Sequence, residues 1–166
     1  MRPAEMSVSL YLRQLIEKHI MKYNVTLPLP DGWTSETEEY EEIDGAPITH
    51  LSCSLADPSG KTGGSVIDLY LGDLPDETTA RDEAFANYAE MVGWDDDDDE
   101  TDPIAEWRFQ NRRAFGFSAL CEDESPLLLM CVEIKKGALL IANIIAPTDE
   151  ELQNLARYVE FHLRLK

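Results

Sequence analysis

The segment Leu127–Ala146, LLLMCVEIKKGALLIANIIA, decides the fold. Its two halves, Leu127–Ile134 and Ala138–Ala146, are apolar at almost every position, which is typical of strands that are covered on both faces. The residues between them, Lys135-Lys136-Gly137, are few, and so short a connection joins neighbouring antiparallel strands. The segment therefore predicts a hairpin in the centre of a sheet.

Shorter segments that alternate in polarity predict further strands around this hairpin. Residues Ile48–Leu55 place Leu51 and Cys53 on one face, with His50 on the opposite face. Residues 34–44 are predicted to form an edge strand, because their glutamates would deter pairing with another sheet edge. The other predicted strands are 23–27, 65–71, 104–110 and 113–120.

Two main helices are predicted as well. An amphipathic stripe covers 84–92, and either Asp76 or Thr78 is expected to cap the helix that carries it. The C-terminal helix opens with a capping box, Thr148 followed three residues later by Glu151.

These elements predict an α+β domain. It would be a largely antiparallel sheet of about seven or eight strands packed against two main helices. A short extra helix is expected near the N-terminus, because apolar residues recur there with helical spacing. The expected organisation is an N-terminal helical segment, 1–22, followed by a single α+β domain, 23–166.

The net charge excludes several classes of partner. The chain has 166 residues, with 33 acidic and 14 basic side chains, which gives a formal charge of −19. Such a chain is expected to bind neither nucleic-acid phosphates nor an anionic membrane. A hydrophobic content of 43 % is too high for a disordered acidic tail. Two segments, 31–44 and 95–102, carry much of the acid and no base.

These acidic segments suggest an interaction role. We expect a non-enzymatic interaction or adaptor module that binds another protein, preferably a basic or amphipathic one. Trp94 adds a large aromatic side chain beside the second segment, and aromatic side chains are frequent in interface hot spots. The candidate contact residues are Glu36, Glu38, Glu39, Glu41, Glu42, Trp94, Asp95, Asp96 and Asp97. Mimicry of nucleic-acid charge is a further alternative.

A cation site in the second acidic segment is another alternative. Its candidate ligands are Asp95, Asp97, Asp99 and Asp102, whose carboxylates suit Ca²⁺ or Mg²⁺. The spacing imitates a calcium loop, but Glu100 stands where the sharp turn of that loop requires glycine. The competing interpretation is a solvated acidic loop that binds no ion, and no cofactor is expected in that case.

An enzyme, such as a small hydrolase, is the remaining alternative. It would depend on His50 and nearby carboxylates, since the sequence has no nucleophile-elbow, zinc-protease or phosphate-loop motif. The cysteines Cys53, Cys121 and Cys131 are an odd number, which predicts buried free thiols in a reduced, cytoplasmic protein. Cys121 and Cys131 are expected to be too far apart in register for a disulfide.

The order of the elements resembles the PsbP-like superfamily. The motif Leu29-Pro30-Asp31-Gly32-Trp33 follows a strand, and a capped helix, a strand meander and a terminal helix come after it. The resemblance runs from about Tyr23 to Lys166 and is greatest with small bacterial members of unknown function. Known members include photosystem extrinsic subunits, a partner of the Ran GTPase and adaptor chaperones for bacterial effectors. The resemblance thus implies an interaction module and assigns no residue-level site.

Overall fold

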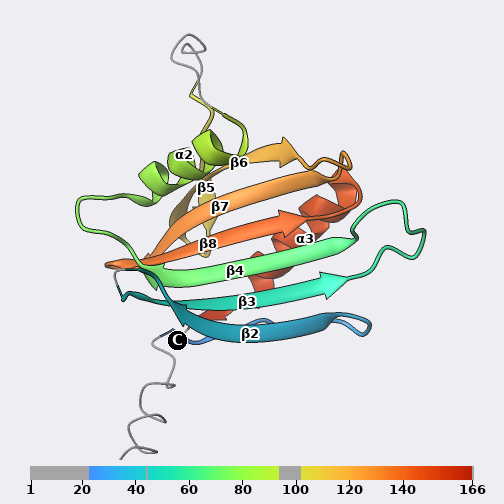
Figure 1. The fold of residues 1–166 in the computed structure, drawn as a ribbon, viewed down its shortest axis with the longest axis horizontal. Helices are drawn as coiled ribbons and strands as arrows, with labels where there is room; N and C mark the ends of the chain where they lie inside the picture. Colours follow the sequence, from blue (N-terminus) through green and yellow to red (C-terminus); the bar gives the residue numbers. More distant parts are fainter. Residues whose placement is uncertain (1–22, 44, 94–101, 166) are drawn as a thin grey trace, which may run out of the picture.

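The computed structural model describes residues 23–43, 45–93 and 102–165 (Figure 1). Its elements in chain order are β1 (Val25–Thr26), β2 (Thr34–Glu41), β3 (Pro47–Leu55), β4 (Ser65–Asp73), α2 (Ala80–Met91), β5 (Ala105–Phe109), β6 (Arg112–Leu120), β7 (Pro126–Lys135), β8 (Ala138–Ile145), α3 (Asp149–His162) and β9 (Arg164–Leu165).

Seven of these strands form one antiparallel sheet in the order β2-β3-β4-β8-β7-β6-β5. This confirms the α+β prediction of an antiparallel sheet with two main helices. The short helix expected within the segment 1–22 lies outside the described residues.

The central hairpin is buried on both faces, as predicted. In β7, Leu127, Leu129 and Cys131 face α2, whereas Met130 and Val132 belong to the core on the opposite face of the sheet. The β7–β8 turn contains Gly137 at φ +82°, a conformation that glycine adopts without strain.

The two helices cover opposite faces of the sheet. Helix α2 packs against β6 and β7, and α3 packs against β7 and β8 from the other side. Figure 1 shows that α2 leaves the same face of β4, β3 and β2 uncovered. That uncovered half of the sheet carries the side chains of His50, Asp68 and Tyr70. Tyr70 lies opposite Ile141, which packs against the core under α2, and His50 and Asp68 share the face of Tyr70.

Three local expectations need correction. Thr79, and neither Asp76 nor Thr78, caps α2, since its hydroxyl accepts a hydrogen bond from the Asp82 amide and the Asp82 carboxylate accepts one from the Thr79 amide. The stripe over 84–92 is buried only in part, since Met91 and Val92 are 46 % and 50 % exposed.

The third expectation that needs correction is the first predicted strand, 23–27. It is reduced to β1, which pairs with β9 in a separate two-stranded ribbon. It therefore does not open the main sheet. The pairing depends on Arg164 and Leu165, which follow the C-terminal helix and are distant in sequence.

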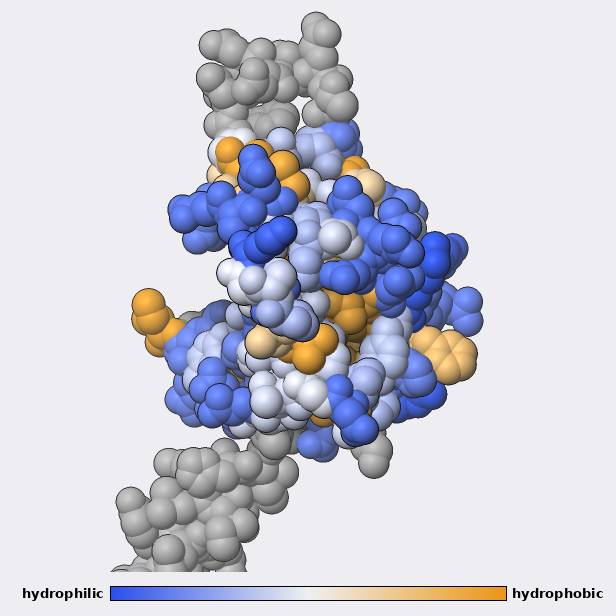
Figure 2. Space-filling model, turned by 90° about the vertical axis from the view of Figure 1, so that its right-hand side faces the viewer, coloured by the Kyte–Doolittle hydropathy of each residue, from blue (hydrophilic) through white to orange (hydrophobic). Residues whose placement is uncertain are grey.

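Exposed hydrophobic side chains are scattered over the described surface. The large ones are Tyr40, Ile43, Met91, Val92, Leu120 and Phe161. Figure 2 shows a mostly hydrophilic face, on which hydrophobic residues gather in small areas and inside a hollow.

The α2 cap gives a direct test of the fold. Replacement Thr79→Ala should lower the free energy of unfolding by about 1 kcal/mol, because it leaves the Asp82 amide without its acceptor. For a domain of this size the melting temperature should fall by about 2–4 °C.

The matched control is Thr78→Ala, one residue away. The Thr78 hydroxyl makes only a long contact of 3.4 Å to the Asp76 carbonyl. This variant should melt within about 1 °C of the wild type, and an equal loss in both variants would contradict the assignment of the cap.

Candidate functional site

The edge strand β2 distributes its glutamates over two faces. It pairs only with β3, which confirms that this acidic segment forms a sheet edge. The register places Glu36 and Glu38 on the face of His50, whereas Glu39 and Glu41 point to the opposite face. The acidic candidates therefore surround the edge and do not form one flat patch. Glu42 follows the end of the strand and is exposed.

Most of the second acidic segment lies outside the described residues. This applies to Trp94, Asp95, Asp96, Asp97 and Asp99. Of the proposed cation ligands, only Asp102 is described. It forms an ion pair with Arg81 and accepts a hydrogen bond of 3.0 Å from the Ile104 amide.

Asp102 could coordinate a cation with both carboxylate oxygens only if its ion pair with Arg81 were broken. Within the described ranges, no group of three or more His, Cys, Asp and Glu side chains has an arrangement that could hold a metal ion.

His50 lies between two carboxylates on the uncovered half of the sheet. Its Nε2 is 2.9 Å from Asp68 Oδ1, and its Nδ1 is 3.3 Å from Glu38 Oε1. The imidazole also stacks on the Tyr70 ring, with centroids 4.2 Å apart and planes inclined by 6°. Burial, followed by the charges of Asp68, Tyr40 and Glu38, raises the pKa of the Tyr70 hydroxyl.

Both ring nitrogens of His50 are thus already engaged. A neutral imidazole donates one hydrogen bond, so only the protonated ring can donate to both carboxylates at once. The prediction that His50 faces the polar side of its strand is confirmed. The geometry does not present a free nitrogen to a substrate, and it supplies no support for the hydrolase alternative.

The basic side chains form a pattern that the sequence analysis missed. The described ranges contain nine Lys and Arg residues, and eight of them line two pockets. Four lie around the end of α3, namely Arg108, Arg112, Arg157 and Arg164. The other four lie beside the start of α2, namely Arg81, Arg113, Lys135 and Lys136. Only Lys61 stands apart.

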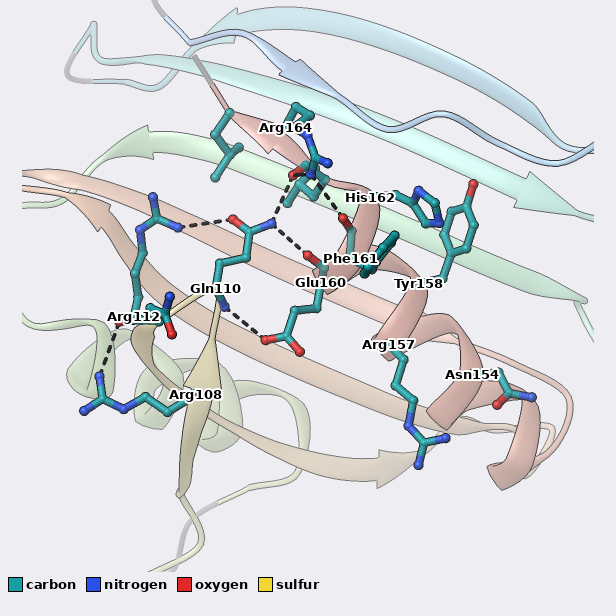
Figure 3. A pocket seen from close by; sticks show the side chains of 13 residues that line it. Arg108, Gln110, Arg112, Asn154, Arg157, Tyr158, Glu160, Phe161, His162 and Arg164 are labelled. Atoms are coloured by element: carbon teal, nitrogen blue, oxygen red, sulfur yellow. Dashed lines mark hydrogen bonds between the residues drawn. The ribbon is translucent and has the colours of Figure 1, made fainter.

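We call the first of these two the arginine pocket. It is an open depression of about 1070 Å³ between the β5–β6 turn and the C-terminal end of α3 (Figure 3). Arg108 and Arg112 come from the β5–β6 hairpin, Arg157 from α3 and Arg164 from β9. Figure 3 shows these side chains at different sides of the depression.

A two-residue turn shapes the floor of the arginine pocket. Gln110 and Asn111 have φ values of +49° and +65°, which is the pattern of a type I′ hairpin turn. The main-chain amide of Gln110 donates to Glu160 Oε2 at 3.0 Å. The side-chain Nε2 of Gln110 donates to the main-chain carbonyls of Glu160 and Leu163 at 2.9 and 3.0 Å. These bonds hold the turn against the last turn of α3.

Two of the four arginines also stabilise this junction. Arg112 donates to the carbonyl of Ile134 at 2.9 Å and to Gln110 Oε1 at 3.2 Å. Arg164 donates to the carbonyls of Phe161 and Leu163, both at 3.1 Å. Carbonyls at the end of a helix lack intrahelical donors, so cations there are favourable.

The other two arginines, Arg108 and Arg157, form fewer hydrogen bonds with the described residues than Arg112 and Arg164 do. Among the described residues, Arg108 makes one long hydrogen bond of 3.4 Å to the Asn111 carbonyl, and its charge helps to lower the pKa of the Glu106 carboxyl group. Arg157 is exposed and forms neither a hydrogen bond nor an ion pair with any described residue. Within the described part of the chain, none of the four arginines is paired with a carboxylate.

The second basic pocket is partly neutralised. Arg113 bonds to both oxygens of Glu106, at 2.8 and 3.2 Å, and the hydrogen bond lowers the pKa of that carboxyl group. Arg81 pairs with Asp102. The arginine pocket is therefore the stronger candidate for a site that receives negative charge from outside.

The signal for this site was present in the sequence but dispersed. Arg108 and Arg112 are four residues apart, yet Arg157 and Arg164 come more than forty residues later. No local motif connects them, and only the contact between the hairpin turn and α3 brings them together.

Comparison with known proteins gives no relative from which a function could be transferred. No family model, curated protein or solved structure matches the chain. Among the described residues, neither helix combines the length and the apolar character that crossing a membrane requires.

The junction below the arginine pocket can be tested by stability. Replacement Gln110→Ala removes the bonds to two helix-end carbonyls and should lower the free energy of unfolding by about 1–3 kcal/mol. Chemical denaturation would measure this change.

The control at the same turn is Asn111→Gly. Glycine adopts a positive φ readily, so this variant should stay within about 1 kcal/mol of the wild type. A Gln110→Ala variant as stable as the wild type would contradict the proposed role of the Gln110 side chain.

Proposed function

We propose that the protein is a non-enzymatic interaction or adaptor module that binds a basic or amphipathic partner along the edge strand β2. The observation that carries this proposal is the position of β2. It is the outer strand of the sheet, it is exposed along most of its length, and glutamates project from both of its faces.

An edge strand offers main-chain groups to an additional strand. A partner segment can pair with such an edge, and side chains on alternate faces then determine which sequences are accepted. Exposed Glu36 and Glu41 project to opposite faces of β2. A segment with Lys or Arg at successive positions would therefore meet a carboxylate on each face.

Two further points support the same proposal. The resemblance to the PsbP-like superfamily, which we retain as part of the proposal, implies a binding role and not a catalytic one. The cytoplasm is the proposed compartment, because Cys53, Cys121 and Cys131 are free thiols.

The test uses a fluorescein-labelled peptide that carries pairs of adjacent lysines separated by valines, so that a paired strand would present lysine on both faces. The double replacement Glu36→Gln with Glu41→Gln should weaken its binding by about threefold to tenfold, because each exposed ion pair contributes up to about 1 kcal/mol. Fluorescence anisotropy would measure the affinity at low and at physiological ionic strength, and wild-type binding should weaken as salt is added.

The control removes the same charge elsewhere, with Glu90→Gln and Glu122→Gln. Both residues are exposed and lie outside β2. Their variant should bind the peptide as the wild type does. Equal loss in the two variants, or binding that ignores salt, would overturn the proposal.

A further inference from the structure

We propose that the arginine pocket binds an acidic peptide segment of a partner protein, one that also carries an apolar side chain. This site differs from β2 in position and has the opposite sign of charge. The inference does not rest on the function proposed for β2.

The first argument is the uncompensated positive charge. The chain contains 33 acidic side chains against 14 basic ones, so carboxylates are abundant. Even so, four guanidinium groups gather around one depression and none of them forms an ion pair among the described residues, although the charge of Arg108 also acts on the Glu106 carboxylate. The one carboxylate in the lining, that of Glu160, accepts the Gln110 amide. Like charges held together repel one another, and a bound anionic group would relieve this repulsion.

The helix end explains only part of the cluster. Arg112 and Arg164 donate to main-chain carbonyls and thereby stabilise the junction. Arg108 and Arg157 do not contribute in this way beyond the one long contact of Arg108. Their guanidinium groups are available to a ligand, and their replacement should leave the fold intact.

The second argument is the shape of the depression. Its volume of about 1070 Å³ lies at the upper limit of the range of about 300–1,000 Å³ that is usual for small-molecule sites, and it is open to solvent. The arginines stand on different sides of it (Figure 3). A single phosphate would require donors that converge on one point, whereas separated arginines match carboxylates spaced along a peptide.

The third argument is the aromatic character of the lining. Phe161 is 74 % exposed and lies in the lining of the pocket beside the arginines. Its neighbour His162 contacts the rings of both Phe161 and Tyr158, with centroids 4.9 and 4.2 Å apart. Arginine and aromatic side chains together are the composition that protein interfaces favour. Phe161 therefore supplies the contact for the apolar side chain of the peptide.

The net charge of −19 does not prevent this binding. At physiological ionic strength the screening length is about 8 Å, so an acidic peptide in the pocket interacts mainly with the arginines around it. The protein as a whole slows its approach, and the local field of the pocket sets its affinity.

The experiment uses a fluorescein-labelled peptide of glutamates with one central phenylalanine. Anisotropy should show binding to the full-length wild type. The double replacement Arg108→Gln with Arg157→Gln should weaken it by about threefold to tenfold. Phe161→Ala, which removes no charge, should weaken binding of this peptide but not of one in which the phenylalanine is replaced by glycine.

The control is Lys61→Gln with Lys136→Gln, which removes the same charge outside the arginine pocket. It should change the affinity by less than about twofold. Equal losses in both double variants would show general charge attraction and would overturn the proposal, as would failure of the wild type to bind the peptide. Competition by inorganic phosphate, measured with the total ionic strength held constant, would indicate a small-anion site. That result would also overturn the proposal.

Discussion

The burial of the β7–β8 hairpin on both faces is the constraint on which the rest of the structure depends. Side chains from this hairpin enter two separate cores, and each core needs its own cover. Helix α2 supplies one cover and α3 supplies the other. Because α3 must lie on the face opposite α2, its C-terminal end comes within reach of the β5–β6 turn. The arginine pocket is a consequence of this placement and of the Gln110 hydrogen bonds that fix it.

The same constraint leaves half of one sheet face without a helix. Helix α2 covers β6 and β7 but does not extend over β2, β3 and β4, so their side chains on that face must be compatible with water. The His50 cluster meets this requirement, since the ring stacks on Tyr70 and its nitrogens meet Asp68 and Glu38. We interpret it as a structural arrangement of an uncovered sheet surface.

Local signals made much of the fold predictable. The apolar hairpin, the alternation in β3 and β4 and the Thr148 cap of α3 each depend on residues close in sequence. The errors arose where distant residues decide the outcome. Segment 23–27 became β1 because it pairs with residues beyond α3, and the stripe over 84–92 is only partly buried, since Met91 and Val92 at its end are exposed. The sequence did not predict the type I′ turn between β5 and β6, because Gln110-Asn111 lacks the glycine that usually marks such a turn.

The candidate site was harder to predict for a related reason. Outside the two acidic segments, the composition suggested an unremarkable mixture of acids and bases, because composition averages over position. The net charge sums the acidic and basic side chains, whereas the fold places them apart. Carboxylates lie on both faces of the β2 edge, and arginines lie around the end of α3. Screening limits each charge to its neighbourhood, so the field at each surface depends mainly on the charges around it. A chain with a formal charge of −19 can therefore present a local site for an acidic ligand, and recognition by this protein has to be judged from the position of each charge and not from their sum.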